Sequence, residues 1–192
     1  MVTLYTVSNF TQPYIQIMKN FFFAMLTLGT LICSAQQKEL IDNNPQEVNL
    51  IGIITRENML QAPYNEWFTP NYDAYKTDKE VMAQLSPLLR EVNLKVFLGT
   101  WCGDSHDQIP VLYKILDEAN FKPENLEVIS VNRNMSTPDG LQKGFNIERI
   151  PTIIVYKKGK EIGRFVEYPR KSVEADLLKI VNGQGYKHVY EK

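Results

Sequence analysis

In the second part of the chain, apolar positions recur first at helical and then at strand spacing. Thr77 with Glu80 forms a capping pattern, and the apolar residues that follow at intervals of three and four predict a helix beginning near Asp78. Pro87 lies inside this helix, so we expect a bend or an early break there. The nearly continuous apolar run over 94–99 then predicts a strand that is buried on both faces.

The same alternation continues along the rest of the sequence. A second helix follows Cys102, with apolar residues at helical spacing up to Ala119, and Pro110 should kink it. The remaining pattern predicts, in order, a strand over 126–131, a short helix over 138–144, a strand over 152–156, a turn over 157–160, a strand over 161–166 and an amphipathic helix over 172–181. This order indicates an α/β sandwich with parallel crossovers and a terminal antiparallel hairpin.

Residues 36–76 form a lead-in segment with a different pattern. A β-branched run over 48–54 suits a strand that extends the sheet, whereas 62–75 is rich in proline, asparagine and aromatic residues and predicts an irregular packed loop. We expect its aromatic residues to pack against the following domain rather than to form a ligand surface; they are Trp67, Phe68, Tyr72 and Tyr75.

Residues 1–35 are interpreted as an N-terminal extension and a secretory signal peptide. The apolar run over 21–32 is shorter than the roughly 17–25 residues of a membrane-spanning helix and suits the core of a signal peptide. We predict that translation starts at Met18 and that cleavage after Ala35 exports the protein to the periplasm or the medium, with no stable membrane span left. The alternatives are an uncleaved anchor through the same run, or lipidation at Cys33.

Composition and charge narrow the possible functions. The 192 residues are 44% hydrophobic and 22% charged, as in an ordinary globular protein of one domain with appendages. A net charge of -1 gives no basic excess, so we expect no nucleic-acid partner. After cleavage Cys102 would be the one cysteine, which excludes an internal disulfide. The histidines His106 and His188 show no metal-ligand spacing, and a glycine-rich phosphate loop is absent from the sequence, so we expect neither a metal nor another cofactor.

Three local motifs occur in a fixed order along these elements. They are Trp-Cys-Gly-Asp-Ser over 101–105, then Pro110, and then Ile-Pro-Thr over 150–152 with the turn at 157–160 behind it. The motifs and the order of elements resemble the thioredoxin family. The resemblance implies a thioredoxin-like three-layer α/β/α sandwich with a mixed sheet over 77–183, followed by a tail over 184–192.

The resemblance also implies how the site is arranged. Pro151 would take the cis form and lie against Cys102, so that the backbone beside Ile150 pairs with a substrate segment. Trp101 would shield the site and contact substrate, although it could equally be a packing residue. The other supporting residues are Gly103, Asp104, Ser105 and His106.

Two departures from the family pattern change the expected chemistry. Ser105 stands where the family has its second active-site cysteine, and Val96 stands where it usually has a buried acidic residue, six positions before the first cysteine. A serine hydroxyl cannot form a sulfur–sulfur bond. The ordinary dithiol cycle is therefore not expected.

The chemistry that remains centres on Cys102 at a helix start, where unpaired amides favour the thiolate. Asp104 and Asp107 would oppose ionisation through like-charge repulsion. His106 could donate to the sulfur or be a solvated surface residue, and Ser105 could be a helix-cap hydroxyl or a hydrogen-bond donor to the sulfur.

Two functions follow from these expectations. The first is an exported thiol–disulfide oxidoreductase or isomerase that works on protein or small-molecule disulfides through Cys102 alone, with the mixed disulfide resolved by an external thiol or reductase. The alternative is a non-catalytic thioredoxin-fold module that binds proteins in the groove beside the cis-proline.

Overall fold

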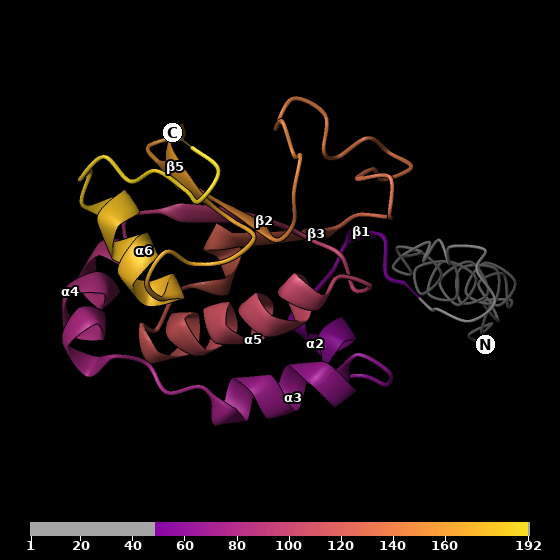
Figure 1. Cartoon of the computed structure of the whole chain (residues 1–192), viewed down its shortest axis with the longest axis horizontal. Helices are drawn as coiled ribbons and strands as arrows, with labels where there is room; N and C mark the ends of the chain where they lie inside the picture. The colour runs from indigo at the N-terminus through magenta and orange to yellow at the C-terminus, as the bar shows by residue number, and fades with distance from the viewer. Residues whose placement is uncertain (1–48, 192) are drawn as a thin grey trace, which may run out of the picture. The chain divides into compact units, whose positions relative to one another are not determined.

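The structure is a computed structural model that describes residues 49–191 (Figure 1). The predictions on the signal peptide, the start at Met18, cleavage after Ala35 and lipidation at Cys33 lie outside the described residues. Among the described helices, none combines the length and apolar character needed to span a bilayer.

A five-stranded sheet forms the centre of the described region. Its order is β1-β3-β2-β4-β5, in which β2 and β3 run parallel and each of the other neighbouring pairs runs antiparallel. The mixed sheet with a terminal hairpin is therefore confirmed. The strands are β1 (Gly52–Ile53), β2 (Asn93–Leu98), β3 (Leu126–Ser130), β4 (Thr152–Lys157) and β5 (Lys160–Val166).

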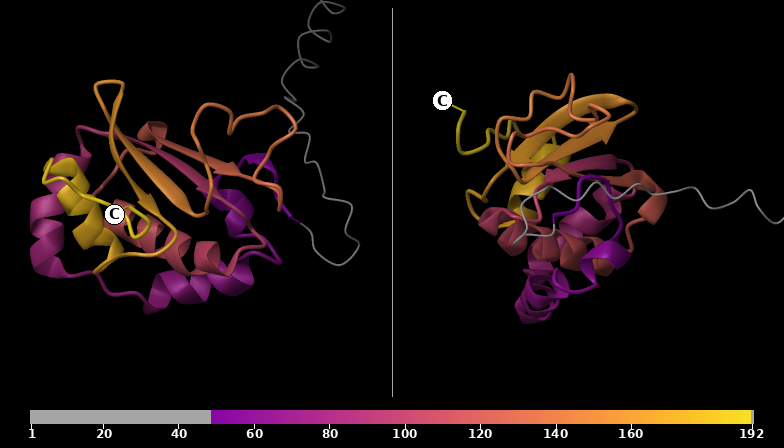
Figure 2. Two further views of the ribbon diagram at one scale, coloured as in Figure 1. Left: turned by 45° about the horizontal axis from the view of Figure 1, so that its top comes forward. Right: turned by 90° about the vertical axis from the view of Figure 1, so that its right-hand side faces the viewer.

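The larger helices cover one face of this sheet (Figures 1 and 2). Alternate residues of β2 point to the two faces: Leu94, Val96 and Leu98 pack among the helices, while Phe97 packs on the opposite side. The helices are α2 (Arg56–Met59), α3 (Asn65–Ala74), α4 (Lys79–Leu89), α5 (Gly103–Glu118) and α6 (Val173–Val181), with a short 3₁₀ turn, η1 (Pro123–Asn125), before β3.

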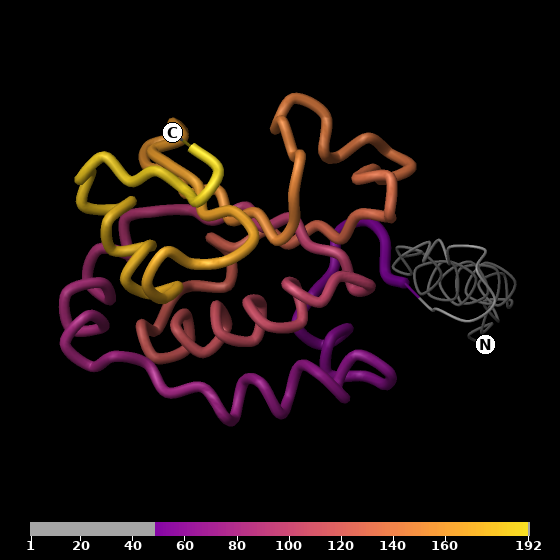
Figure 3. Tube along the Cα trace, in the orientation of Figure 1, coloured from indigo at the N-terminus to yellow at the C-terminus, as the bar shows by residue number. Residues whose placement is uncertain are grey.

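The opposite face is covered by a loop over 131–151, which Figure 3 traces as the orange excursion above the sheet. The prediction of a short helix over 138–144 is wrong, because the chain forms turns there. Gly140 and Gly144 have φ of 69° and 84°, which a helix does not accommodate. The loop instead folds on its own polar side chains: the Asn132 side chain accepts from the backbone of Asn134 and Ser136. The third layer is thus a loop, not a helix.

Helix α3 corrects the prediction of an irregular loop over 62–75. Phe68 is buried and meets the ring of Tyr113 on α5 edge-on at 5.5 Å, and the Tyr72 hydroxyl donates to Asp117 at 2.6 Å. Tertiary packing thus outweighs the poor helix propensity of Asn65 and Pro70. The expectation that the aromatic residues pack against the domain is confirmed.

Helix α4 begins where the sequence predicted but is capped differently. The Asp78 carboxylate accepts from the amides of Glu80 and Val81, whereas the Thr77 hydroxyl donates to Glu118 on α5. The helix continues past Pro87, so the early break does not occur.

The first strand is shorter than predicted. β1 occupies only Gly52–Ile53 of the expected 48–54, yet it pairs antiparallel with β3 and so extends the sheet as the pattern indicated. Leu50, Ile54 and Phe68 share the helix-side core with α4, α5 and α6, so the described lead-in residues and the following domain have one hydrophobic core.

Candidate functional site

Cys102 lies at the carboxyl end of the central strand β2, where the chain turns into α5. Its amide donates to the Gly99 carbonyl at 2.9 Å, which closes a tight turn over 99–102. The residue is the N-cap of α5, with φ -98° and ψ 124°, and its carbonyl accepts from the His106 amide. Because the first amides of a helix lack intrahelical partners, this placement sets the sulfur beside unpaired donors.

The cysteine is a half-exposed free thiol next to the Ile-Pro segment. Its Sγ lies 3.6 Å from the Ile150 carbonyl oxygen, to which the thiol donates. The Ile150–Pro151 peptide bond is cis. The Pro151 carbonyl accepts from the Glu167 amide at 2.7 Å, and the Thr152 hydroxyl donates to the Arg149 carbonyl at 2.6 Å. The structure therefore places Cys102 beside Ile150, whose peptide bond to Pro151 has the cis form that the family resemblance implied.

Trp101 folds back over the sheet face that carries the 131–151 loop. Its indole N–H donates to the Val131 carbonyl at 2.9 Å, and the Arg133 guanidinium lies 4.9 Å from its ring. It packs with Phe97 and Ile150 in the same apolar cluster. Trp101 is thus a packing residue that also flanks the cysteine.

Ser105 is fully buried one turn after Cys102. Its hydroxyl oxygen accepts from the Gly99 amide at 3.2 Å, so it ties the first turn of α5 to the end of β2. This observed partner differs from both predicted ones, the sulfur and a helix-end amide. Position 105 therefore carries a buried hydroxyl that is bonded to the backbone.

His106 is half-buried, and its side chain contacts the backbone and not the sulfur. Its Nε2 lies 2.7 Å from the Thr100 carbonyl oxygen, and its ring stacks on Trp67 with 4.3 Å between centroids. The side-chain amide of Asn71 donates to the His106 carbonyl at 3.0 Å. The sequence predicted Trp67 only as a packing residue and gave no indication of Asn71, although their spacing of four places both on one face once the segment is a helix.

The acidic residues near Cys102 and the apolar residue at 96 have opposite surroundings. Asp104 is half-exposed in the first turn of α5, and Gly103 and Asp107 are exposed. Val96 is buried in the helix-side core, paired with Val128 and Ile153 in the neighbouring strands. Packed hydrocarbon thus surrounds position 96, six residues before Cys102.

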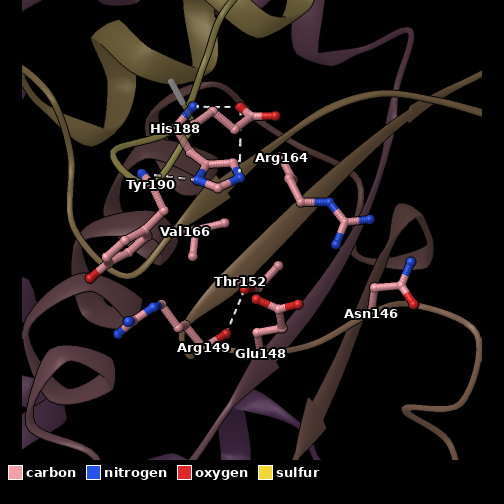
Figure 4. A pocket seen from close by; sticks show the side chains of 9 residues that line it. Asn146, Glu148, Arg149, Thr152, Arg164, Val166, His188 and Tyr190 are labelled. Atoms are coloured by element: carbon pink, nitrogen blue, oxygen red, sulfur yellow. Dashed lines mark hydrogen bonds and ion pairs between the residues drawn. The ribbon is translucent and has the colours of Figure 1, made fainter.

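A pocket lined by Arg149, Thr152 and Arg164 lies at the β5 edge of the sheet (Figure 4). The Arg164 guanidinium is paired with Glu161 and the Phe145 carbonyl, and Arg149 is paired with Glu167. The positive charges of the two arginines in the pocket are therefore largely balanced by Glu161 and Glu167. Its walls come from the segment before β4, from β4 and β5 and from the tail, and they include Asn146, Glu148, Thr152, His188, Tyr190 and Glu191.

Comparison with known proteins agrees with this arrangement. A family model described as thioredoxin matches residues 56–179, so the match includes α2 and α3, which precede the boundary predicted at Thr77. A thioredoxin of Staphylococcus saprophyticus is 32% identical over 88 residues, covering 46% of this chain and 80% of the relative. A thioredoxin of Mycolicibacterium smegmatis is 30% identical over 94 residues, covering 49% and 75%.

A solved structure supports the fold alone. A protein of unknown function from Pseudomonas aeruginosa superposes with a TM-score of 0.50 at 18% identity, covering 65% of this chain and 87% of its own.

Proposed function

This chain belongs to the thioredoxin family, and from that premise we propose that it is an exported thiol–disulfide oxidoreductase or isomerase that works through Cys102 alone. The observation that carries the proposal is the placement of the half-exposed Cys102 thiol at the start of α5, 3.6 Å from the Ile150 carbonyl, with a buried serine at 105. The thioredoxin relatives support thiol–disulfide exchange at this general level.

The chemistry proceeds in two exchanges. In the first, the Cys102 thiolate attacks one sulfur of a substrate disulfide, a new bond forms between Cys102 and that sulfur, and the other substrate sulfur leaves as a thiolate. In the second, an external thiolate or a different thiolate of the same substrate attacks the substrate sulfur of the mixed disulfide and releases Cys102 as a thiolate. When the attacking group is a different substrate thiolate, the substrate gains a new disulfide in place of the old one and is rearranged without net oxidation. Attack by an external thiol transfers the adduct to it.

The proposed site holds the substrate by the backbone on the Ile150 side. Because the Cys102 thiol and the Ile150 carbonyl are adjacent, an extended substrate segment would lie along residues 149–151 while its disulfide meets the sulfur. Proteins or small molecules that carry disulfides are the expected partners.

The test measures adduct formation and isomerisation together. Wild-type protein mixed with oxidised glutathione should gain one glutathione at Cys102 by intact mass, and it should refold a scrambled disulfide protein in a glutathione buffer. Cys102→Ser should do neither. A wild type that forms no adduct while still binding extended peptides, with Cys102→Ser binding them equally, would replace the enzyme by the non-catalytic binding module.

Export makes a separate prediction. If residues 21–35 end a signal peptide, the protein recovered from the periplasm or medium of an expressing bacterium should begin at Gln36. Amino-terminal sequencing with intact mass measures this directly. A protein that keeps residues 21–32, or one that carries lipid on Cys33, would support the anchored or lipidated alternative.

A further inference from the structure

We propose that helix α3 is part of the reactive site, with Trp67, Asn71 and His106 acting as positioning residues for Cys102. The proposal rests on the proposed function for its catalytic consequence. Its structural half, that these three residues immobilise the turn over 99–102, stands independently.

The first step is the bond between the His106 side chain and the Thr100 backbone. A carbonyl oxygen only accepts, so the Nε2 that lies 2.7 Å away carries the proton. Thr100 precedes Cys102 by two residues and His106 follows it by four. The contact therefore closes a clamp around the cysteine, from the end of β2 to the first turn of α5. It also commits Nε2 to the backbone, so that His106 acts on Cys102 through the turn.

The second step is what holds His106 itself. Its ring lies nearly parallel to that of Trp67, at 11° between planes, and its carbonyl accepts from Asn71. Trp67 and Asn71 are four residues apart in α3, on the face that meets α5, and Phe68 anchors the helix beside Tyr113. The imidazole is thus fixed on one face by a stacked ring, and its backbone is fixed from the same helix.

The third step is that Thr100 is held from another direction as well. Its hydroxyl accepts from the Leu50 amide at 3.1 Å and donates to the Asn49 side-chain oxygen at 3.4 Å, and the residue is buried. The turn that carries Cys102 is therefore held at Thr100 by two sets of contacts. One set comes from Asn49 and Leu50, and the other comes from α3 through His106. Neither contact depends on a second cysteine.

The variants separate the ring from its N–H group. His106→Phe keeps a ring to stack on Trp67 but removes the donor to Thr100, whereas His106→Gln keeps an N–H near the Nε2 position without the ring. Trp67→Leu removes the stack. Tyr75→Phe is the matched control, because it removes a hydrogen bond from the end of the same segment to Glu174, on α6 and away from the turn.

Two readouts are needed. Hydrogen exchange of the Cys102 amide reports whether the turn is held, and the rate of mixed-disulfide formation with insulin reports whether Cys102 is positioned. We expect His106→Phe and Trp67→Leu to exchange the amide about 10-fold faster and to react roughly 3- to 10-fold more slowly, because a displaced nucleophile loses its aligned approach. His106→Gln should have an amide exchange rate and an insulin reaction rate close to those of the wild type. Tyr75→Phe should match the wild type in both.

The outcomes are distinguishable. Unchanged amide exchange in His106→Phe overturns the clamp, and faster exchange with an unchanged insulin rate reduces these residues to a structural role and overturns the positioning claim. A failure of His106→Gln to recover either readout also overturns the assignment of Nε2. If the wild type forms no mixed disulfide with insulin but its amide exchange responds as expected, the clamp stands and the proposed function fails.

Discussion

Ser105→Cys should reduce insulin disulfides, in the presence of a dithiol reductant, on the order of 10-fold or more faster than the wild type. In the proposed mechanism the wild-type mixed disulfide is resolved by a thiol from outside, whereas a thiol at 105 would attack from within the molecule at a high effective concentration. Cys102 is the N-cap of α5 and 105 is its third residue, so the two side chains belong to the same first turn. Turnover is read from insulin precipitation, and the 102–105 disulfide from intact mass after oxidation.

The control is the Ser105→Cys protein that also carries Cys102→Ala. Position 105 is fully buried, so a thiol there has no access to a protein disulfide and the double variant should be inactive. Loss of the hydroxyl that accepts from the Gly99 amide should cost about 1 kcal/mol in unfolding free energy. A Ser105→Cys protein that folds and forms the disulfide without gaining turnover would show that Ser105 is not the limiting departure.

Val96 limits the size of this gain. A dithiol cycle needs the second thiol to lose its proton, and the packed hydrocarbon around Val96 supplies no base at that position. Ser105→Cys should therefore remain slower than a complete dithiol enzyme. Adding Val96→Asp would bury a carboxyl group between Val128 and Ile153, at a cost of several kcal/mol unless it is hydrogen-bonded.

The sequence predicts those parts of the fold whose stability comes from local pattern. The run at 94–99 is a buried central strand because it is apolar on both faces, and the strand-to-helix position of Cys102 follows from it. The turn between β4 and β5 is equally local: Lys158 and Gly159 both take positive φ, at 52° and 75°, as a tight hairpin requires.

The conformations of two segments, 65–74 and 138–144, could not be predicted in this way, because contacts with other elements determine them. Helix α3 carries Asn65 and Pro70, so its local composition matches a loop, and burial of Phe68 against α5 makes it a helix. Conversely, 138–144 begins with Pro138 and ends at Gly144, as a short helix can, but it forms turns because Gly140 and Gly144 take positive φ and Leu141 packs against the apolar cluster on the sheet.

The hydrogen-bond partner of the His106 side chain could not be predicted from the sequence for a different reason. Its Nε2 contacts a backbone carbonyl, and a carbonyl has the same chemistry at every position, so the sequence offers no signal for the contact. The stacking ring of Trp67 comes from a segment whose helical state itself depends on packing. The motif therefore predicts which residue reacts, whereas tertiary structure determines what contacts its neighbours.

Gly99 follows the last residue of β2 and packs closely against Ile150 and Trp101. A Cβ built there would lie 2.7 Å from the Ile150 Cδ1 atom and 2.7 Å from the Trp101 ring. The Ile150 methyl can rotate away, but the Trp101 ring is held by its bond to the Val131 carbonyl. Gly99→Ala should therefore displace Trp101 and lower the unfolding free energy by about 1–3 kcal/mol, as overpacking does. Urea unfolding measures the loss, and tryptophan fluorescence reports the displaced ring.

Gly103→Ala is the matched control for this effect, because a Cβ at 103 meets nothing within 4 Å and the position is the first residue of α5. It should be neutral or stabilising by up to about 1 kcal/mol, since alanine favours the helix over glycine. With Trp67→Phe as a common background, Trp101 is the remaining tryptophan and the fluorescence change can be assigned to it. Equal stability of the Gly99→Ala and Gly103→Ala proteins, with unchanged Trp101 emission, would mean that the turn tolerates a side chain at 99 and would contradict the prediction.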